Sequence, residues 1–235
     1  MFLFFRCGSY SGIVSCQNFC YYLVRSTLLH LICLDLEGVL VPEIWITFSE
    51  KTGIPEFRIT TRDEPDYDKL MRFRIELLAK HNLKLKDIQN VIGGIEPLPG
   101  ALDFTRQLKE KTQFVILSDT FAEFARPLMA KLDYPTLFCN SMEIAGDGTV
   151  LKHVMRQQNG KKCAVTAFKS LNIKVFAAGD SFNDLAMIEE ADEGCLFRAP
   201  QAIRDAYPRL PCAESHDGLM EIIDSFLSHP IDKPL

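Results

Sequence analysis

Three short segments of the 235-residue chain place carboxylate and hydroxyl side chains directly after apolar runs. Asp35 and Glu37 follow LICL, Ser118 and Asp119 follow QFVIL, and Asp180 follows VFAAG. A carboxylate nucleophile can form an acyl-phosphate, and a second carboxylate nearby can serve as acid and base. A hydroxyl can donate to a phosphoryl oxygen, and a further carboxylate suits a hard cation such as Mg²⁺. The set predicts phosphoryl transfer; without a Gly-rich Walker loop, a nucleotide-driven kinase is disfavoured.

The apolar runs predict the strands of a parallel sheet. Four of them are short and uninterrupted, as is typical of strands buried on both faces, at 31–36, 113–119, 175–181 and 195–200. Helical patterns alternate with them, at 100–111, 121–132, 161–171 and 183–191, and 148–154 predicts one arm of a hairpin. A doubly wound α/β fold follows, with a ligand site beyond the carboxyl ends of the strands. One Asp or Ser at a strand end can merely cap the next helix, but three favour a shared site.

A helical insertion is predicted between the first strand and the turn at 97–100. Its helical patterns cover 44–51, 66–81 and 85–91, and no buried-strand pattern occurs among them. An insertion after the first strand is placed to cover the carboxyl edge of the sheet. We therefore expect a core formed by residues 29–41 and 97–235, and a small helical cap formed by residues 42–96.

Arg74 interrupts the apolar stripe of the second helix in this insertion. Leu70, Leu77 and Leu78 set the stripe, and Met71 precedes Arg74 on an adjoining line. An arginine whose stem packs while its head reaches water would explain the pattern. If the stripe faces the sheet edge instead, Arg74 is a receptor for a carboxylate or a phosphate. The pattern alone leaves both interpretations open.

The motifs resemble those of the haloacid dehalogenase (HAD)-like phosphatases. DLEGV at 35–39, SDT at 118–120 and GDSFND at 179–184 are similar to three motifs of that family in order and spacing, and the helical insertion is similar to its first type of cap. Most members have Asp where this chain has Glu37. Glu there is typical of a subgroup, the phosphoserine phosphatases that also transfer the phosphoryl group to homoserine. Further segments resemble that subgroup, namely LDLEGVLVPEIW at 34–45, TTRDEPDYDKLM at 60–71 and VILSDTFAEFARPLM at 115–129.

The resemblance implies an Mg²⁺-dependent phosphoserine phosphatase that works through an aspartyl-phosphate, with phosphotransfer to homoserine as a second activity. It makes Asp35 the nucleophile and a metal ligand. Glu37 would exchange protons through its carboxyl group and give its backbone carbonyl to the metal. Asp180 would supply the other carboxylate ligand, and Asp184 would orient the ligands around the metal.

The resemblance also requires a phosphate-binding lysine before the last motif, and the chain offers Lys161, Lys162 and Lys169. Lys169 falls in the middle of a predicted amphipathic helix, where packing explains it. A lysine at the start of that helix suits a phosphate better, so we expect Lys161 rather than Lys162. Ser118 and the backbone of Asp119 would hold the phosphoryl group.

The remaining substrate contacts implied by the resemblance lie mostly in the insertion. Glu43 would meet the ammonium group of the substrate and Arg74 its carboxylate, with Met71 and Asn183 completing the pocket. A zwitterionic amino acid needs both an acid and a base, so this pair favours phosphoserine. Two other functions stay open: a HAD-like phosphatase for another small phosphomonoester, and a catalytically silent HAD-like binding protein.

Composition excludes several classes of partner. Lys+Arg 26 against Asp+Glu 31 gives a net charge of −5 without a basic run, so nucleic-acid binding is not expected. No apolar stretch reaches the roughly 18 residues of a membrane span. The eight cysteines are mostly scattered singly, which favours reduced thiols in the cytoplasm. The resemblance implies a homodimer. Residues 1–28 match nothing, and we expect a disordered extension or a start assigned upstream of the real one.

Trp45 and the histidines carry weaker expectations. Trp45 follows Glu43 by two residues, and core packing is its expected role, with lining of the cap as the alternative. No two histidines are spaced as a pair of metal ligands. Surface or helix-end positions are expected for His81, His153, His216 and His229.

Overall fold

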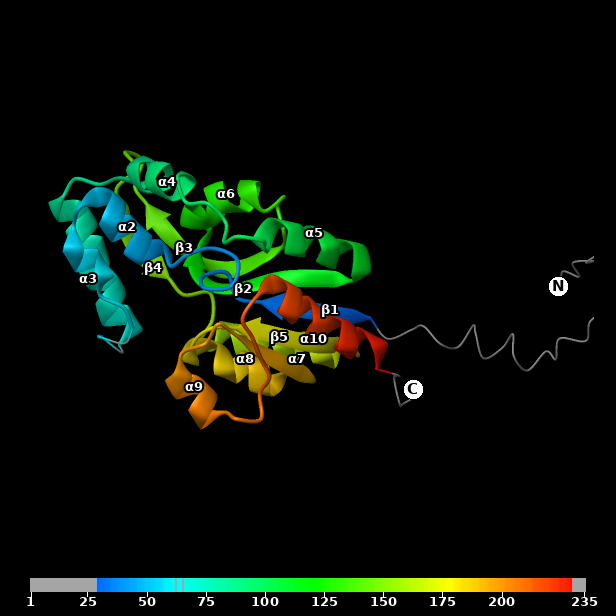
Figure 1. Cartoon of the computed structure of the whole chain (residues 1–235). Helices are drawn as coiled ribbons and strands as arrows, with labels where there is room; N and C mark the ends of the chain where they lie inside the picture. Colours follow the sequence, from blue (N-terminus) through cyan, green and yellow to red (C-terminus); the bar gives the residue numbers. More distant parts are fainter. Residues whose placement is uncertain (1–28, 62, 65, 230–235) are drawn as a thin grey trace, which may run out of the picture.

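A seven-stranded sheet organises the chain (Figure 1). The computed structural model describes residues 29–61, 63–64 and 66–229, and the extension expected at 1–28 lies outside them. The strands run in the order β4-β3-β2-β1-β5-β6-β7. Their bounds are β1 (His30–Leu34), β2 (Gln113–Phe121), β3 (Leu137–Ile144), β4 (Val150–Val154), β5 (Lys174–Gly179), β6 (Glu193–Phe197) and β7 (Cys212–Ala213). Among these described strands β4 alone pairs antiparallel, with β3, so the predicted parallel sheet and its hairpin arm are confirmed.

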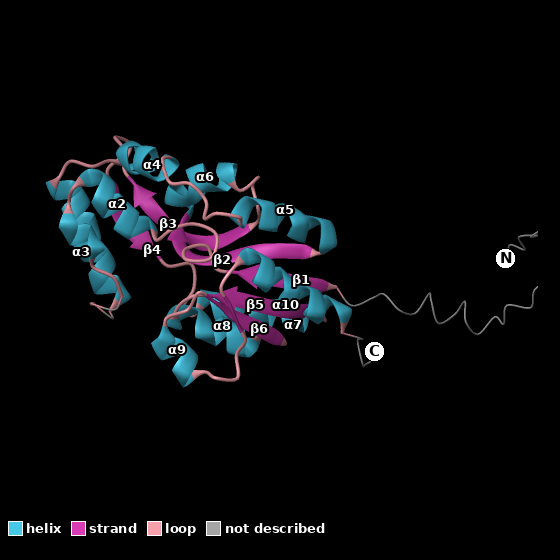
Figure 2. Cartoon of the chain, in the orientation of Figure 1, coloured by secondary structure: helices cyan, strands magenta, loops and turns pink. Residues whose placement is uncertain are grey.

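Helices cover both faces of this sheet (Figure 2). On one face lie α5 (Ala101–Lys111), α6 (Ala122–Lys131) and α10 (His216–Ser228), and on the other lie α7 (Gly160–Ser170) and α8 (Leu185–Glu190). The short helices η2 (Phe182–Asp184) and α9 (Gln201–Ala206) complete this part of the chain. The arrangement confirms the doubly wound α/β fold.

Alternation along β1 shows why its residues 31–34 are all apolar. Ile32 and Leu34 belong to the buried cluster that includes α5, α6 and α10. Leu31 and Cys33 belong to the cluster that includes α7 and α8. Because successive side chains of a strand point to opposite faces, a stretch of strand that is covered on both faces is apolar at successive positions.

The strand order places a switch point at the middle of the sheet. From β1 the chain first builds β2 and β3 on one side and later adds β5 and β6 on the other side. The register aligns Leu34 of β1 with Ile116 of β2 and Ala178 of β5. The carboxyl ends of these three strands therefore meet in one crevice, where ligands bind in sheets of this kind.

The helical insertion, which is the name we use for residues 42–96, lies at the carboxyl end of the sheet (Figure 1). It consists of α2 (Ile44–Thr52), the 3₁₀ helix η1 (Pro55–Arg58), α3 (Tyr67–Lys80) and α4 (Leu85–Gly93). The first residues of α3 contact the sheet: the Tyr67 hydroxyl donates to the Asp119 carbonyl at 3.0 Å, and His153 lies 2.8 Å from Asp68. These bonds position α3 above the carboxyl end of β2.

One buried histidine joins the two chain segments that connect the insertion with the sheet. The ring nitrogens of His216 lie 2.8 Å from the Val39 carbonyl and 3.2 Å from the Pro99 carbonyl. Between the same segments, the Leu98 N–H donates to the Leu40 carbonyl at 2.9 Å. His216 begins α10, as the helix-end expectation allows, but it is only 4% exposed, so the surface position was wrong.

Two further observations concern the described residues as a whole. None of their helices combines the length and the apolar character needed to cross a bilayer. Their cysteines are unpaired, namely Cys33, Cys139, Cys163, Cys195 and Cys212.

Candidate active site

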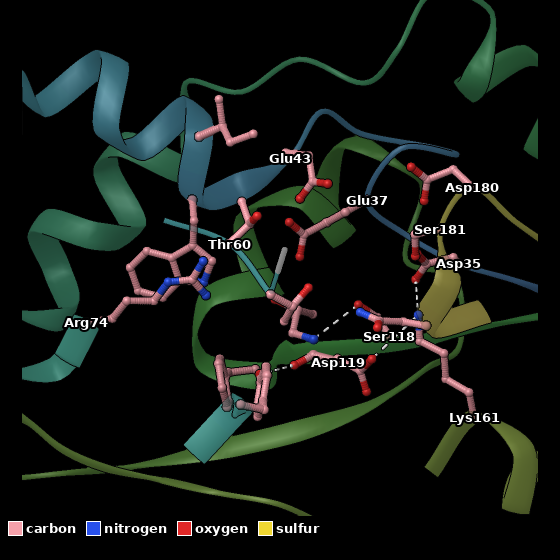
Figure 3. A pocket seen from close by; sticks show the side chains of 17 residues that line it. Asp35, Glu37, Glu43, Thr60, Arg74, Ser118, Asp119, Lys161, Asp180 and Ser181 are labelled. Atoms are coloured by element: carbon pink, nitrogen blue, oxygen red, sulfur yellow. Dashed lines mark hydrogen bonds and ion pairs between the residues drawn. The ribbon is translucent and has the colours of Figure 1, made fainter. Parts of the chain in front are cut away.

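Lys161 lies among the carboxylates at the carboxyl end of the sheet (Figure 3). It stands at the start of α7, and its Nζ is 2.8 Å from Asp35 Oδ1, 2.7 Å from Asp184 Oδ1 and 3.8 Å from Asp119 Oδ2. Burial alone would lower the pKa of Lys161, but the charges of Asp184 and Asp35 outweigh it and raise the pKa well above its ordinary value. The ammonium group therefore stays charged.

The two other candidate lysines point away from this cluster. Lys162 Nζ lies 3.5 Å from the carboxylate of Glu190 at the surface. Lys169 donates to the Glu190 backbone carbonyl at 2.6 Å. Of the three lysines, Lys161 is the one that the fold brings to Asp35.

Asp184 holds the loop that follows β5. Its side chain is fully buried, and Oδ2 accepts hydrogen bonds from the N–H groups of Asp180 and Ser181 at 3.1 and 3.0 Å and from the Ser181 hydroxyl at 2.9 Å. A Cβ on Gly179 would lie 2.3 Å from Asp184 Cβ, so the loop requires glycine there. The other oxygen of Asp184, Oδ1, accepts a hydrogen bond from Lys161, so Asp184 connects Lys161 with this loop.

Three carboxylates form a cluster that could hold a cation. Oxygen atoms of Asp35, Asp180 and Asp184 all lie within 4.8 Å of one another. Gly38 packs against this cluster with φ +77°, and an added Cβ would lie 2.4 Å from the Asp180 carboxyl carbon. Burial, then the charge of Asp184, raises the pKa of Asp35 well above its ordinary value, while Lys161 opposes the shift. Burial also raises the pKa of Asp180, to about 7.

Ser118 and Asp119 lie at the end of β2, next to Asp35. Ser118 is 6% exposed, and its Oγ accepts the Thr120 N–H at 3.2 Å, which orients the hydroxyl. The Asp119 carbonyl accepts from the Tyr67 hydroxyl and from Asn140 Nδ2 at 3.2 Å. The backbone at this strand end is thus fixed from the insertion and from β3.

Glu37 connects the strand end with the insertion. Its Oε2 accepts the N–H of Ile44 at 2.7 Å, and Ile44 is the first residue of α2. This bond satisfies one of the N–H groups that a helix start leaves without an intrahelical partner. Burial and the neighbouring charge of Glu43 nevertheless raise the pKa of Glu37 to about 7. A carboxyl group with that pKa can both give and take a proton near neutral pH.

Arg74 reaches the site from α3. It is 5% exposed, so its head does not lie in water, and the interpretation that the stripe faces the sheet edge is the one that the structure favours. Nη2 donates to the Ile59 carbonyl at 2.8 Å, and the guanidinium carbon lies 4.5 Å from the centroid of the Trp45 ring. Burial lowers the pKa of Arg74 to about 10, which leaves it charged at neutral pH.

A cavity of about 140 Å³ separates Arg74 and Glu43 from Asp35 and Lys161 (Figure 3). Expected site residues line it, namely Asp35, Glu37, Glu43, Arg74, Ser118, Asp119, Lys161, Asp180 and Asn183. Sequence reasoning did not assign to the site several others that also line it, namely Ile46, Thr60, Thr61, Tyr67, Thr120, Phe121 and Ser181.

Three further residues considered for the site differ in their position relative to the cavity. Asp184 does not line the cavity but bonds to Lys161, which does. Met71 is fully buried and does not line the cavity; its Sδ lies 3.7 Å from Arg74 Nη1. Trp45 packs in an aromatic cluster and also lines the cavity, so both roles considered for it apply.

Comparison with solved structures shows which proteins share this fold. A phospho-aspartyl intermediate analogue of phosphoserine phosphatase superposes with a TM-score of 0.67 at 20% identity, covering 85% of this chain and 99% of that one. Phosphoserine phosphatase in apo form superposes with a TM-score of 0.65 at 23% identity, covering 83% and 98%. These likenesses show the fold, which the chain shares with phosphoserine phosphatases.

Sequence comparison defines the family. Phosphoserine phosphatase ThrH of Pseudomonas aeruginosa is 52% identical over 187 residues, which cover 80% of this chain and 91% of that protein. A phosphoserine phosphatase of Pseudomonas syringae is also 52% identical over 187 residues, covering 80% and 79%. The chain belongs to the phosphoserine phosphatase family. No protein-family model matches it.

Proposed function

We propose that the chain is an Mg²⁺-dependent phosphatase that hydrolyses O-phospho-L-serine through an aspartyl-phosphate on Asp35. One observation carries this proposal: a single cavity has Asp35 and Lys161 on its sheet side and Glu43 and Arg74 on its insertion side. Phosphoserine carries a phosphate at one end and an ammonium and a carboxylate at the other. The names of the two Pseudomonas relatives support the same substrate.

The charges on the two sides of the cavity match those of this substrate. Lys161 and the Ser118 hydroxyl would hold the phosphoryl oxygens. Glu43 would pair with the ammonium group, and Arg74 would pair with the carboxylate. Substrate held at both ends would lie with its phosphorus next to Asp35, which is the orientation that an in-line attack requires.

In the first step, an oxygen of Asp35 attacks phosphorus while the bond between phosphorus and the serine oxygen breaks. The leaving oxygen takes a proton from Glu37, whose pKa of about 7 keeps a large share of it protonated at neutral pH. Serine leaves, and Asp35 carries the phosphoryl group. Lys161 balances the charge of the phosphoryl oxygens throughout.

In the second step, Glu37 acts as a base. Its carboxylate takes a proton from a water molecule while the water oxygen bonds to phosphorus. The bond between phosphorus and Asp35 breaks, inorganic phosphate leaves, and both carboxyl groups return to their starting state. The bond from the Ile44 N–H engages Oε2 of Glu37, so the other oxygen is the one for proton transfer.

The carboxylate cluster fits Mg²⁺ chemically. Lys161 is the ammonium group that pairs with the carboxylates of Asp35, Asp119 and Asp184, and Asp180 lies beside two of them. Burial and the neighbouring negative charges raise the pKa values of Asp35 and Asp180. Oxygen ligands are those that Mg²⁺ prefers. We propose that Asp35 and Asp180 would hold the ion together with the Glu37 backbone carbonyl, and that Asp184 orients them. When bound, Mg²⁺ would neutralise negative charge on the phosphoryl group.

The same site can accept an alcohol in place of water. Homoserine has the ammonium and carboxylate of serine and a side chain longer by one methylene group, so Glu43 and Arg74 would hold it in the same way. Glu37 would then take the proton of the homoserine hydroxyl, and phosphohomoserine would form. We propose this transfer as a second activity, in competition with hydrolysis for the same phosphoenzyme.

The proposal also covers the domain organisation, the cellular compartment and the oligomeric state of the enzyme. We assign residues 29–41 and 97–235 to the catalytic core and residues 42–96 to a cap over it. The unpaired cysteines of the described residues are consistent with a reducing compartment, the cytoplasm. Light scattering on the purified full chain would measure the proposed homodimer directly.

A ³¹P NMR time course tests the activity. The full chain is incubated with phosphoserine and Mg²⁺, with and without homoserine, beside Asp35→Asn. We expect inorganic phosphate from the wild type, a phosphohomoserine signal only when homoserine is present, and neither from the variant. If inorganic phosphate is the only product even with homoserine present, the proposed transfer activity is wrong. If the wild type leaves phosphoserine intact, the proposed substrate is wrong. Hydrolysis of other phosphomonoesters would then indicate a phosphatase of different specificity, and no hydrolysis of any of them would indicate a catalytically silent protein.

A further inference from the structure

Arg74 lies against the face of an aromatic ring inside the cavity. Its guanidinium carbon is 4.5 Å from the centroid of the Trp45 ring, within the range of a cation–π contact. The two residues come from different helices, Trp45 from α2 and Arg74 from α3, and both line the cavity. The ring is therefore positioned to fix the plane of the guanidinium group.

Trp45 is itself held firmly. It stacks on Phe57 with 5.6 Å between ring centroids and an interplanar angle of 23°. It also makes edge contacts with Phe48 and Phe124, at 5.8 Å each. Phe124 belongs to α6, which packs on the sheet, so the Trp45 ring is tied to the core as well as to the insertion. Close packing of this kind leaves the ring little freedom to turn.

The polar contacts of Arg74 are incomplete within the described residues. Nη2 donates to the Ile59 carbonyl, and Nη1 lies 3.7 Å from Met71 Sδ, a weak acceptor. Nε is buried and has no hydrogen-bond partner in the part of the chain that the structure describes. A buried donor without a partner is unfavourable, so the guanidinium group is prepared for an acceptor brought by a ligand.

We propose that Trp45 is a positioning residue that holds Arg74 for the carboxylate of the substrate, and that it thereby selects phosphomonoesters that carry a carboxylate. The proposal rests on the proposed function, in which Arg74 meets that group. The flat ring restricts the guanidinium group to one plane and shields it from water, so that less freedom is lost when a planar carboxylate binds. O-phosphoethanolamine, which has the phosphate and the ammonium group but no carboxylate, would gain nothing from Trp45.

Kinetics with these two substrates test the proposal. We expect Trp45→Leu to lower kcat/KM for phosphoserine about 5- to 30-fold, through KM, with kcat changed less than about twofold. The ratio of kcat/KM for phosphoserine to that for phosphoethanolamine falls by the same factor. Trp45→Phe keeps an aromatic face, so its ratio stays within about threefold of the wild type. Equal losses with both substrates would overturn the proposal, because a general packing defect affects both alike.

A double-mutant cycle separates a positioning role from an independent one. If Trp45 acts through Arg74, adding Trp45→Leu to Arg74→Met causes no further loss in kcat/KM for phosphoserine. Additive losses would contradict the proposal. Thermal unfolding of each variant measures how much of any change reflects stability.

Fluorescence gives a readout that needs no turnover, because Trp45 is the single tryptophan of the chain. We expect its emission to change when phosphoserine is added to Asp35→Asn, and to change much less with phosphoethanolamine or inorganic phosphate. The change should disappear in Asp35→Asn combined with Arg74→Met. Equal responses to phosphoserine and phosphoethanolamine would overturn the proposal.

Failure of the proposed function looks different from failure of this inference. If the wild type hydrolyses phosphoethanolamine with the same kcat/KM as phosphoserine, and Arg74→Met leaves the ratio of the two kcat/KM values unchanged, then Arg74 does not bind a carboxylate. A wild type with a strong preference for phosphoserine that Trp45→Leu leaves intact would overturn only the role of Trp45.

Discussion

The two sides of the cavity are built in different ways. On the phosphoryl side, formed by Asp35, Ser118, Lys161 and Asp180 and supported by Asp184, charged side chains are held by hydrogen bonds from strand ends and the start of α7. On the insertion side, formed by Glu43, Trp45, Thr60, Tyr67 and Arg74, much of the positioning comes from aromatic packing between helices.

This difference indicates how well each side of the cavity tolerates substitution. A charge network such as that around Lys161 loses several partners when one member changes, so the reaction chemistry tolerates little substitution. Packing between helices of the insertion tolerates changes of shape more readily. We therefore expect substitutions on the phosphoryl side to abolish turnover and substitutions on the insertion side to alter which substrate is used.

The largest effect is expected from Asp35→Asn. An amide cannot attack phosphorus, so kcat should fall at least about 10⁴-fold, while the similar shape keeps the fold. Steady-state assays measure the loss, and mass spectrometry of acid-quenched wild type detects the phosphoenzyme that the variant lacks. If Asp35→Asn still forms a phosphoenzyme, the nucleophile is another residue, and the role assigned to Asp35 is wrong.

Lys161→Met should lower kcat/KM by about 10²- to 10³-fold. The substitution removes the cation that balances Asp35 and the phosphoryl oxygens. Lys162→Met is the matched control, because Lys162 makes only a 3.5 Å contact with Glu190 at the surface, and it should stay within about twofold of the wild type. Similar losses in both variants would mean that Lys161 has no special place on the phosphoryl side.

Tyr67→Phe tests the contact between the two sides. The substitution removes the 3.0 Å hydrogen bond from the Tyr67 hydroxyl to the Asp119 carbonyl. Such a bond contributes about 0.5–1.5 kcal/mol to stability. We expect a loss of about 3- to 10-fold in kcat/KM for phosphoserine. Tyr207→Phe, remote from the cavity at the end of α9, serves as the control. Unchanged kinetics for Tyr67→Phe would show that the two sides are aligned without this bond.

The smallest effect on activity is expected from His216→Gln, which should change how stability depends on pH. Burial lowers the pKa of His216 below its ordinary value of 6.5, with Arg198 adding to the shift and the Val39 and Pro99 carbonyls and Asp217 opposing it. Below pH 6.5 the unfolded chain therefore binds this proton first, and the folded state loses stability as the pH falls.

Denaturant unfolding between pH 7.5 and pH 5 measures this effect. The wild type should lose stability by up to about 1.4 kcal/mol per pH unit more than His216→Gln, which has no titrating group there. His81→Gln, at the exposed end of α3, is the control and should follow the wild type. Equal slopes for the wild type and His216→Gln would contradict the shifted pKa.

Much of the sheet could be predicted from the sequence because its central strands are covered on both faces. Residues 31–34 and 175–179 therefore carry uninterrupted apolar runs. Strands farther from the centre lack this signal: β3, which pairs with β2 and β4, is mostly half-buried and contains Asn140, and the edge strand β7 has two residues. Neither strand was identified, because a partly covered strand resembles a loop in its sequence.

The phosphoryl side of the site was predicted more completely than the insertion side for a similar reason. Its acids follow strands, so topology alone brings them together. Trp45 and Thr60 lie within segments that resemble the subgroup, 34–45 and 60–71, but those patterns do not indicate which of their side chains reach the cavity. Tyr67 did have a signal, because it precedes Arg74 by seven residues and so continues the buried stripe of α3 by two turns towards its start.

The bonds around His216 have a consequence for protein engineering. Val39 and Pro99 are held by the same imidazole ring, and Leu98 bonds to Leu40. The two ends of the insertion thus leave the core side by side, at a junction that the core itself closes. Such a junction is a natural splice point: helices from another protein could replace residues 42–96 with short linkers, and new substrate pockets could be grafted over an unchanged reaction centre.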